Sequence, residues 1–140
     1  MRPDAIHSAA TSLIDVVFPD RANHYGTLFG GHALQLMGKA AFIAATRHAR
    51  RPVVMASSDN ITFDEPVRVG DLIECVASIA RIGRASMTVT VDLIREDALS
   101  GRRRPAVHGR FEMVAVDASG CPTPIVEPQD PSDIQEEAAL

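Results

Sequence analysis

The stretch GHALQLMGKAAFIAATRHA, residues 31–49, decides the fold class. Good helix formers dominate it, its apolar residues follow helical spacing, and no proline occurs before Pro52. The apolar stripe consists of Ala33, Leu36, Met37, Ala40 and Ala44. A flank of small side chains allows a sheet to curve closely around this segment; its members are Ala40, Ala41, Ala44 and Ala45. We therefore predict one long helix that packs against a sheet.

The segments on either side of the helix read as strands. Ser12 to Phe18 is a short β-branched run, and turn-forming residues follow from Pro19 to Gly26. After the helix the apolar period changes to two. This pattern predicts strands over residues 53–59, 61–63, 72–82, 86–94 and 106–116, with hairpin turns at 82–84 and 98–101. We expect an α+β fold in which a five- or six-stranded antiparallel sheet wraps around the helix.

Length and composition indicate one globular domain. A chain of 140 residues is the size of a single domain. Hydrophobic residues make up 46% and charged residues 23%, which excludes a disordered chain. Aromatic residues make up only 4%, which disfavours a stacking platform for single-stranded nucleic acid. We predict one domain over residues 1–121, followed by a proline-rich acidic tail over residues 122–140.

Charge and cysteine content restrict the partners and the compartment. The formal net charge of −4 comes from the acidic tail, and the remaining chain lacks the basic field that nucleic-acid binding requires. No apolar run approaches ~18 residues, so no membrane partner is expected. Cys75 and Cys121 have no CxxC spacing, and the N-terminus has no secretory signal pattern. We therefore predict a cytoplasmic protein with Cys75 as a buried small hydrophobe.

Four segments carry a resemblance to a known family. They are NHYGTLFGG at 23–31, ITF at 61–63, PVRVGD at 66–71, and residues 111–117. Over about residues 13–124 the chain resembles the hotdog-fold acyl-CoA thioesterases, in particular the YciA-like and brain-type acyl-CoA hydrolase branch. The resemblance implies a hotdog fold, hydrolysis of an acyl-CoA, and homodimers whose sheets join edge to edge, with trimers of dimers as a further assembly. It implies no metal and no cofactor, since CoA is part of the substrate.

Thioester hydrolysis requires donors for the oxygen that becomes negative, a positioned water and a proton acceptor. Gly30 and Gly31 precede the helix, where unpaired N–H groups and the positive end of the helix dipole are available. We predict these two glycines as oxyanion donors. Alternatively they only permit a tight loop-to-helix junction, and the two roles can coexist. Asn23 and Thr27 match positions that the family uses beside the thioester.

The proton acceptor is the difficult assignment. The family usually has aspartate after the Leu-Met pair, whereas this chain has Gly38. Asp59 is the predicted substitute base. Alternatively, the Asp59 carboxylate has a structural role and holds a strand end or an arginine. His24 and His32 are second choices with a suitable unperturbed pKa, against the alternative that they are solvent-exposed.

Other polar residues receive weaker assignments. Asp64 and Glu65, directly before Pro66, are expected to be turn residues outside the site. Arg84 and Ser86 are predicted to lie beside the CoA nucleotide, because the corresponding turn does so in the resembling enzymes. The run Arg102–Arg104 is a weaker phosphate candidate, since such a run is usually a solvated turn.

The function predicted from these residues is that of an acyl-CoA thioesterase whose base has moved from position 38. The alternative is a non-hydrolytic acyl-CoA-binding or regulatory hotdog protein. A dehydratase acting on acyl carrier protein substrates ranks third, because residues 23–31 do not match its pattern.

Overall fold

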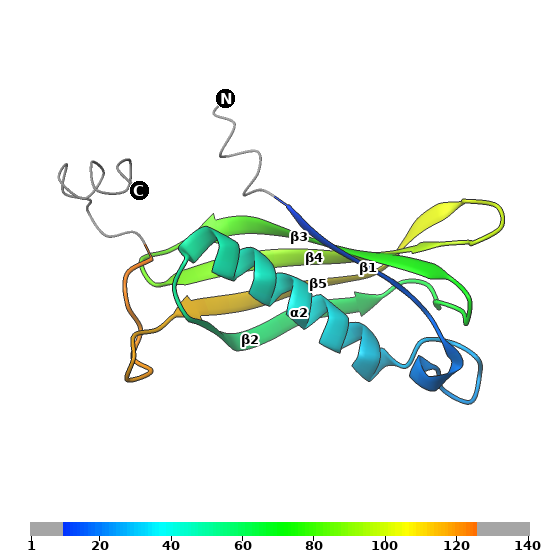
Figure 1. Ribbon diagram of the computed structural model, residues 1–140, viewed down its shortest axis with the longest axis horizontal. Coiled ribbons are helices and arrows are strands. Elements are labelled where there is room, and N and C mark those ends of the chain that lie inside the picture. Colours follow the sequence, from blue (N-terminus) through cyan, green and yellow to red (C-terminus); the bar gives the residue numbers. More distant parts are fainter. Residues whose placement is uncertain (1–9, 126–140) are drawn as a thin grey trace, which may run out of the picture.

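A computed structural model describes residues 10–125, which form one long helix packed against a five-stranded sheet (Figure 1). The helix is α2 (Gly30–Ala49), and a short 3-10 helix, η1 (Pro19–Arg21), precedes it. The strands are β1 (Thr11–Val16), β2 (Val53–Phe63), β3 (Leu72–Ile82), β4 (Ser86–Glu96) and β5 (Arg103–Ala115). Their order is β1-β3-β4-β5-β2, and every neighbouring pair is antiparallel. The predicted α+β architecture is confirmed.

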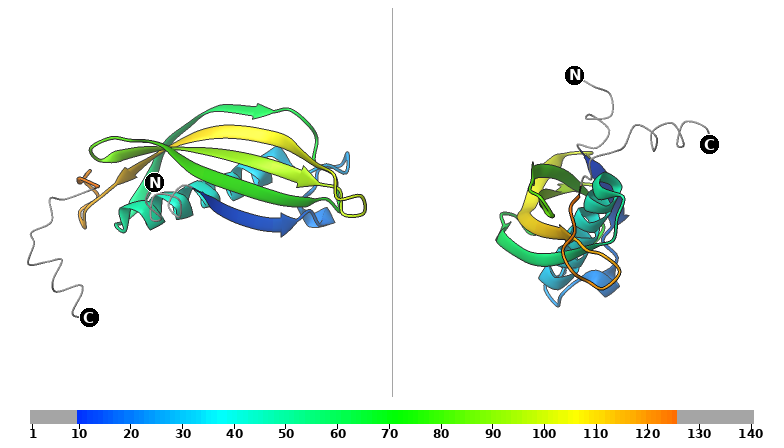
Figure 2. Two further views of the ribbon diagram at one scale, coloured as in Figure 1. Left: turned by 90° about the horizontal axis from the view of Figure 1, so that it is seen from above. Right: turned by 90° about the vertical axis from the view of Figure 1, so that its left-hand side faces the viewer.

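Alanine content explains how closely the sheet curves around the helix (Figure 2). The buried face of α2 consists of Ala33, Met37, Ala40, Ala41, Ala44, Ala45 and Ala49. It packs against fully buried side chains of the sheet, among them Met87, Val89 and Phe111. Small side chains on the helix let the two backbones approach without leaving voids. Cys75 belongs to this core, as expected, and burial raises the pKa of its thiol to about 12.

The strand β2 differs from the sequence prediction. Residues 53–59 and 61–63 belong to one strand, within which Asn60 has a positive φ of 53°. The pairing with β5 shifts register between Met55 and Ser57, and again between Asp59 and Thr62. Asn60, which resembled a strand break, therefore belongs to an irregularity inside the strand.

The domain continues beyond residue 121. The N–H of Thr123 donates to the Ala115 carbonyl, and the N–H of Ile125 donates to the Arg84 carbonyl, both at 2.9 Å. The Ile125 side chain is buried. Residues 122–125, assigned to the tail from sequence, thus pack on the domain, and the rest of the predicted tail lies outside the described residues. Within the part of the chain that the structure describes, no helix is long and apolar enough to cross a membrane.

Candidate active site

The loop before α2 is organised by the Asn23 side chain. Its Oδ1 accepts hydrogen bonds from the N–H of Tyr25 at 2.9 Å, the N–H of Thr27 at 3.2 Å and the Thr27 hydroxyl at 3.1 Å. Three donors fix this atom as the oxygen of the amide. The Nδ2 group of Asn23 is therefore the part of the side chain that can serve a ligand.

The N-terminus of α2 carries two N–H groups with no partner. The N-cap residue Phe29 forms no side-chain cap, and its carbonyl accepts the N–H groups of His32 and Ala33. The N–H groups of Gly30 and Gly31 find no acceptor among residues 10–125. Because the helix dipole also places positive charge here, the two groups suit a developing oxyanion.

The two glycines differ in their steric role. A Cβ at Gly31 would lie 2.7 Å from the Phe29 ring, which would have to shift. A Cβ at Gly30 would make only ordinary contacts, at 3.6 Å from the Phe63 ring. A glycine is therefore needed at position 31 for the tight junction between loop and helix, which is compatible with a donor role of its N–H.

A cavity of about 290 Å³ lies against Gly30. Its lining residues are Thr27, Leu28, Gly30, Ala33, Phe63, Asp64, Glu65, Pro66, Val67 and Val107. The fold thus brings Thr27 and Gly30 together with Asp64 and Glu65, which the sequence predicts as turn residues outside the site. The signal that pointed to them is their position between the motif segments 61–63 and 66–71.

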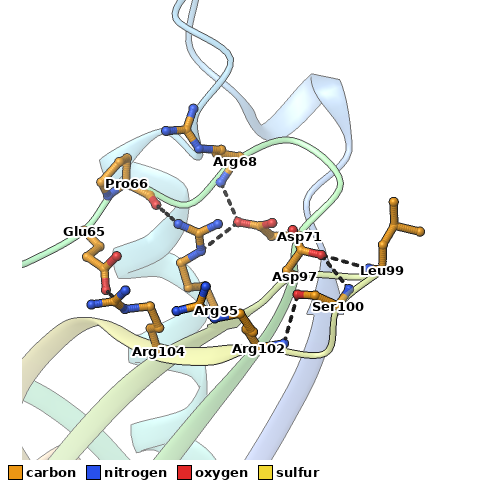
Figure 3. A network of polar contacts seen from close by, with 10 residues as sticks. All are labelled: Glu65, Pro66, Arg68, Asp71, Arg95, Asp97, Leu99, Ser100, Arg102 and Arg104. Atoms are coloured by element: carbon orange, nitrogen blue, oxygen red, sulfur yellow. Dashed lines mark hydrogen bonds and ion pairs between the residues drawn. The ribbon is translucent and has the colours of Figure 1, made fainter.

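The two carboxylates have different surroundings. Their N–H groups both donate to the Ala106 carbonyl, at 2.8 Å for Asp64 and 3.3 Å for Glu65, which anchors the turn to β5. The Glu65 carboxylate pairs with Nε of Arg104 at 3.0 Å (Figure 3). Asp64 is exposed, and among the described residues its carboxylate has neither a hydrogen bond nor an ion pair.

An ion-pair network holds the cavity wall that follows the turn. Nε of Arg95 lies 3.1 Å from Oδ2 of Asp71, and its Nη1 donates to the Pro66 carbonyl at 3.2 Å (Figure 3). The same Asp71 oxygen accepts the N–H of Arg68 at 2.9 Å. Because Asp71 is buried and Arg95 is partly buried, these bonds are less screened by solvent than surface pairs, and they fix residues 66–71 against β4.

The predicted base Asp59 lies on the face of the sheet opposite α2. Asp59 pairs with Arg110 of β5, whose neighbours Gly109 and Phe111 face the helix, so that Arg110 and Asp59 face away from it. The Asp59 carboxylate lies 3.9 Å from Nε of Arg110. The register shift after Met55 reverses the alternation, since an extra residue moves the side chains that follow it, up to the second shift after Asp59, to the other face. The structure therefore does not bring Asp59 to Gly30 within one subunit. It favours the alternative that Asp59 holds an arginine.

Gly38, where the carboxylate is missing, contacts a residue that sequence reasoning overlooked. A Cβ at Gly38 would lie 3.1 Å from Cε of Met55 in β2. Gly38 is also eight residues along α2 from Gly30, a distance of ~12 Å at the usual helical rise. In one subunit, position 38 is therefore remote from the unpaired glycine N–H groups and covered by Met55.

The histidines lie away from this cavity. His24 is exposed, and its ring lies against the Tyr25 ring at a centroid distance of 4.0 Å, tilted by 38°. His32 lines a separate cavity of about 120 Å³, where its Nδ1 is 3.4 Å from Arg21 Nη1. Neither residue is among those that line the larger cavity.

The predicted nucleotide residues occupy the other end of the molecule. Arg84 lies in the β3–β4 turn and Ser86 begins β4, at the left of Figure 1, whereas α2 begins at the right. One subunit therefore does not join them to Gly30. In the run 102–104, Arg103 pairs with Glu74 and Glu96, and Arg104 pairs with Glu65, which indicates intrachain roles for these two.

Comparison with known proteins shows the family to which this fold belongs. The family model described as "Thioesterase superfamily" matches residues 25–101. This chain belongs to the thioesterase superfamily. It is 36% identical over 109 residues to the uncharacterized acyl-CoA thioester hydrolase YkhA of Bacillus subtilis, covering 78% of this chain and 63% of that protein. It is 31% identical over 113 residues to the acyl-CoA thioester hydrolase YciA of Salmonella typhimurium, covering 79% and 85%. The resemblance predicted from sequence is confirmed.

Solved thioesterase structures share the fold of this family member. An apo-hexameric acyl-CoA thioesterase superimposes with a TM-score of 0.83 at 36% identity, covering 96% of this chain and 88% of that one. A Staphylococcus aureus acyl-CoA hydrolase in complex with butyryl coenzyme A gives a TM-score of 0.80 at 30% identity, covering 95% and 88%. Further structures of that hydrolase carry alanine in place of a threonine, an aspartate or an asparagine.

Proposed function

We propose that this protein hydrolyses an acyl-CoA thioester to the free acid and CoA. The observation that carries the proposal is the cavity at the start of α2. Gly30, whose N–H has no acceptor among residues 10–125, lines it together with Thr27, Asp64 and Glu65. The named activities of the relatives YkhA and YciA support the same reaction.

In this reaction the thioester carbonyl oxygen lies against the N–H groups of Gly30 and Gly31. Attack by water at the carbonyl carbon converts that oxygen to an oxyanion, which these donors and the helix dipole stabilise more strongly than the ground-state carbonyl. The Nδ2 group of Asn23, in the loop that precedes the helix, is available as a further donor, because its Oδ1 already accepts from Tyr25 and Thr27. The C–S bond then breaks, and sulfur leaves with the electron pair and is protonated.

We further propose that two copies complete the site by joining their β2 edges in antiparallel fashion. β2 is an edge strand with exposed apolar side chains at Val54, Met55 and Phe63. Phe42, one turn of α2 after Gly38, is also exposed and shares the helix face that is turned toward Met55. An uncovered apolar edge of this kind favours a partner strand. Hexameric neighbours support assembly as a trimer of such dimers.

The dimer would bring opposite ends of the two sheets together. Antiparallel pairing places the start of β2 in one subunit beside the end of β2 in the other. Arg84 of the partner subunit then approaches the cavity, where its charge can serve the CoA phosphates.

We also propose the cytoplasm as the compartment, which the free thiols of Cys75 and Cys121 support.

A second candidate, binding without hydrolysis, is favoured by one observation. In the Staphylococcus enzyme, the substituted aspartate and threonine follow the substituted asparagine at two fixed sequence intervals. The same two intervals, counted from Asn23 in this chain, lead to Gly38 and Met55. Neither residue can accept a proton from water. Hydrolysis by this chain therefore requires a base elsewhere.

A thiol-release assay over acyl-CoA substrates of increasing chain length separates the two functions. Calorimetric titration with CoA and with acyl-CoA measures binding independently of turnover. Release of CoA that is saturable in acyl-CoA supports hydrolysis. Saturable binding without release of CoA at any chain length would establish the binding function instead.

A further inference from the structure

The hydrolysis proposed above lacks an assigned proton acceptor, and the inference that follows rests on that function. Position 38 carries no carboxylate and is covered by Met55. Asp59 lies on the far face of the sheet beside Arg110. The histidines do not line the cavity that contains Gly30. Within one subunit, these observations leave the carboxylates of the cavity itself.

Asp64 is the cavity carboxylate that is free to act. Both Asp64 and Glu65 line the cavity, but Glu65 is neutralised by Arg104 at 3.0 Å. Among residues 10–125 the Asp64 carboxylate has no hydrogen-bonding or ionic partner, so both its oxygens remain available to water. Its backbone is fixed, because its N–H donates to the Ala106 carbonyl at 2.8 Å. A fixed backbone with an unpaired carboxylate suits a general base.

The position of Asp64 also fits the oxyanion donors. Thr27 and Gly30 line the same cavity, so a thioester carbonyl held at the helix N-terminus lies across this space from the turn. A water between the carbonyl carbon and Asp64 can hydrogen-bond to the carboxylate and to the Thr27 hydroxyl. Water, carbonyl and base then occupy one cavity of one subunit.

We propose that Asp64 is the general base that activates the hydrolytic water. The carboxylate takes one proton from water while the water oxygen bonds to the carbonyl carbon, and the carbonyl π electrons move to oxygen, which becomes the oxyanion bound by Gly30 and Gly31. When the oxyanion collapses, the C–S bond breaks and its electron pair leaves on sulfur. Asp64 returns its proton to the thiolate. One thioester and one water give one carboxylic acid and one CoA thiol.

The test compares Asp64→Asn with Asp59→Asn. The two variants make the same chemical change, one in the cavity and one on the opposite face of the sheet. We expect Asp64→Asn to lower kcat about 10²-fold or more, in the usual range for loss of a general base, with KM changed less than threefold. Asp59→Asn should retain kcat within about twofold. Circular dichroism and thermal melting of both variants check that the fold is kept.

Chemical rescue provides a readout that a structural role of Asp64 would not produce. In Asp64→Ala, added formate can occupy the vacated space and accept the proton from water. We expect kcat of this variant to rise with formate concentration, while formate leaves the wild-type protein and Asp59→Asn unaffected.

The outcomes separate the two proposals. Full activity of Asp64→Asn, or a large loss in Asp59→Asn alone, would overturn the base assignment while leaving hydrolysis intact. A wild-type protein that binds acyl-CoA without releasing CoA would overturn the proposed hydrolysis, and the base assignment with it.

Discussion

The methyl group of Met55 lies 3.1 Å from the point where a Cβ at Gly38 would stand. Met55 is in β2 and Gly38 is in the middle of α2, so the contact joins helix and edge strand. A mid-helix glycine costs roughly 1 kcal/mol relative to alanine. The Met55 side chain, which is unbranched and flexible, fills the space that the missing Cβ of Gly38 leaves.

The first prediction concerns this contact and stability. Gly38→Ala gains helix propensity but presses on Met55, so its stabilisation should fall below the ~1 kcal/mol expected from propensity alone. In a Met55→Ala background the full gain should appear. Urea denaturation of the wild type, both single variants and the double variant measures the coupling. Equal effects of Gly38→Ala in the two backgrounds would show that the contact has no energetic consequence.

The second prediction restores a carboxylate to the helix. Gly38→Asp alone places a charged group against the Met55 methyl, which desolvates it. Combined with Met55→Thr, the carboxylate gains a hydroxyl neighbour and room. Within one subunit position 38 is remote from Gly30, so the new carboxylate can act only at the cavity of the partner subunit in the proposed dimer. There we expect the double variant to hydrolyse acyl-CoA faster than wild type and faster than Gly38→Asp, measured as kcat by thiol release. Gly38→Ala with Met55→Thr is the control without a carboxylate, and an equal rise in that control would contradict the explanation.

The third prediction concerns CoA binding. If Arg84 reaches the phosphates from the partner subunit, the contact is equal in ground and transition states. Arg84→Ala should then raise KM several-fold, leave kcat nearly unchanged and weaken the salt dependence of KM. Steady-state kinetics at low and high ionic strength measure these effects. An unchanged KM with a lowered kcat would contradict the assignment.

The fourth prediction concerns assembly. Phe42 is 46% exposed on α2, on the apolar surface around β2 that we assign to the dimer. Phe42→Glu should dissociate the assembly because it places a charge in an apolar interface. Leu99→Glu, at a 99% exposed position in the β4–β5 hairpin, is the matched control and should leave the mass unchanged. Light scattering of the wild type at micromolar concentration comes first, since a monomer there would remove the dimeric site.

The site was less predictable than the fold because catalytic groups act through distance and direction. Local sequence placed Gly30 and Gly31 correctly at the helix start, since capping and helix propensity act over a few residues. The face that Asp59 occupies depends on a bulge after Met55, which the alternating pattern did not reveal. Asp64 resembled an ordinary turn residue until folding placed it beside Thr27 and Gly30.

By itself, the sequence determined the element types and the resemblance to a family. The helix from about residue 31 to residue 49 and the antiparallel strands follow from periodicities of 3.6 and 2, which are local properties of the chain. Only the tertiary structure decided that Met55 covers Gly38, that Asp59 lies opposite Arg110, and that Asp64 lines the Gly30 cavity. These relationships join residues of different elements, and they depend on strand register and packing, which no short stretch of sequence encodes.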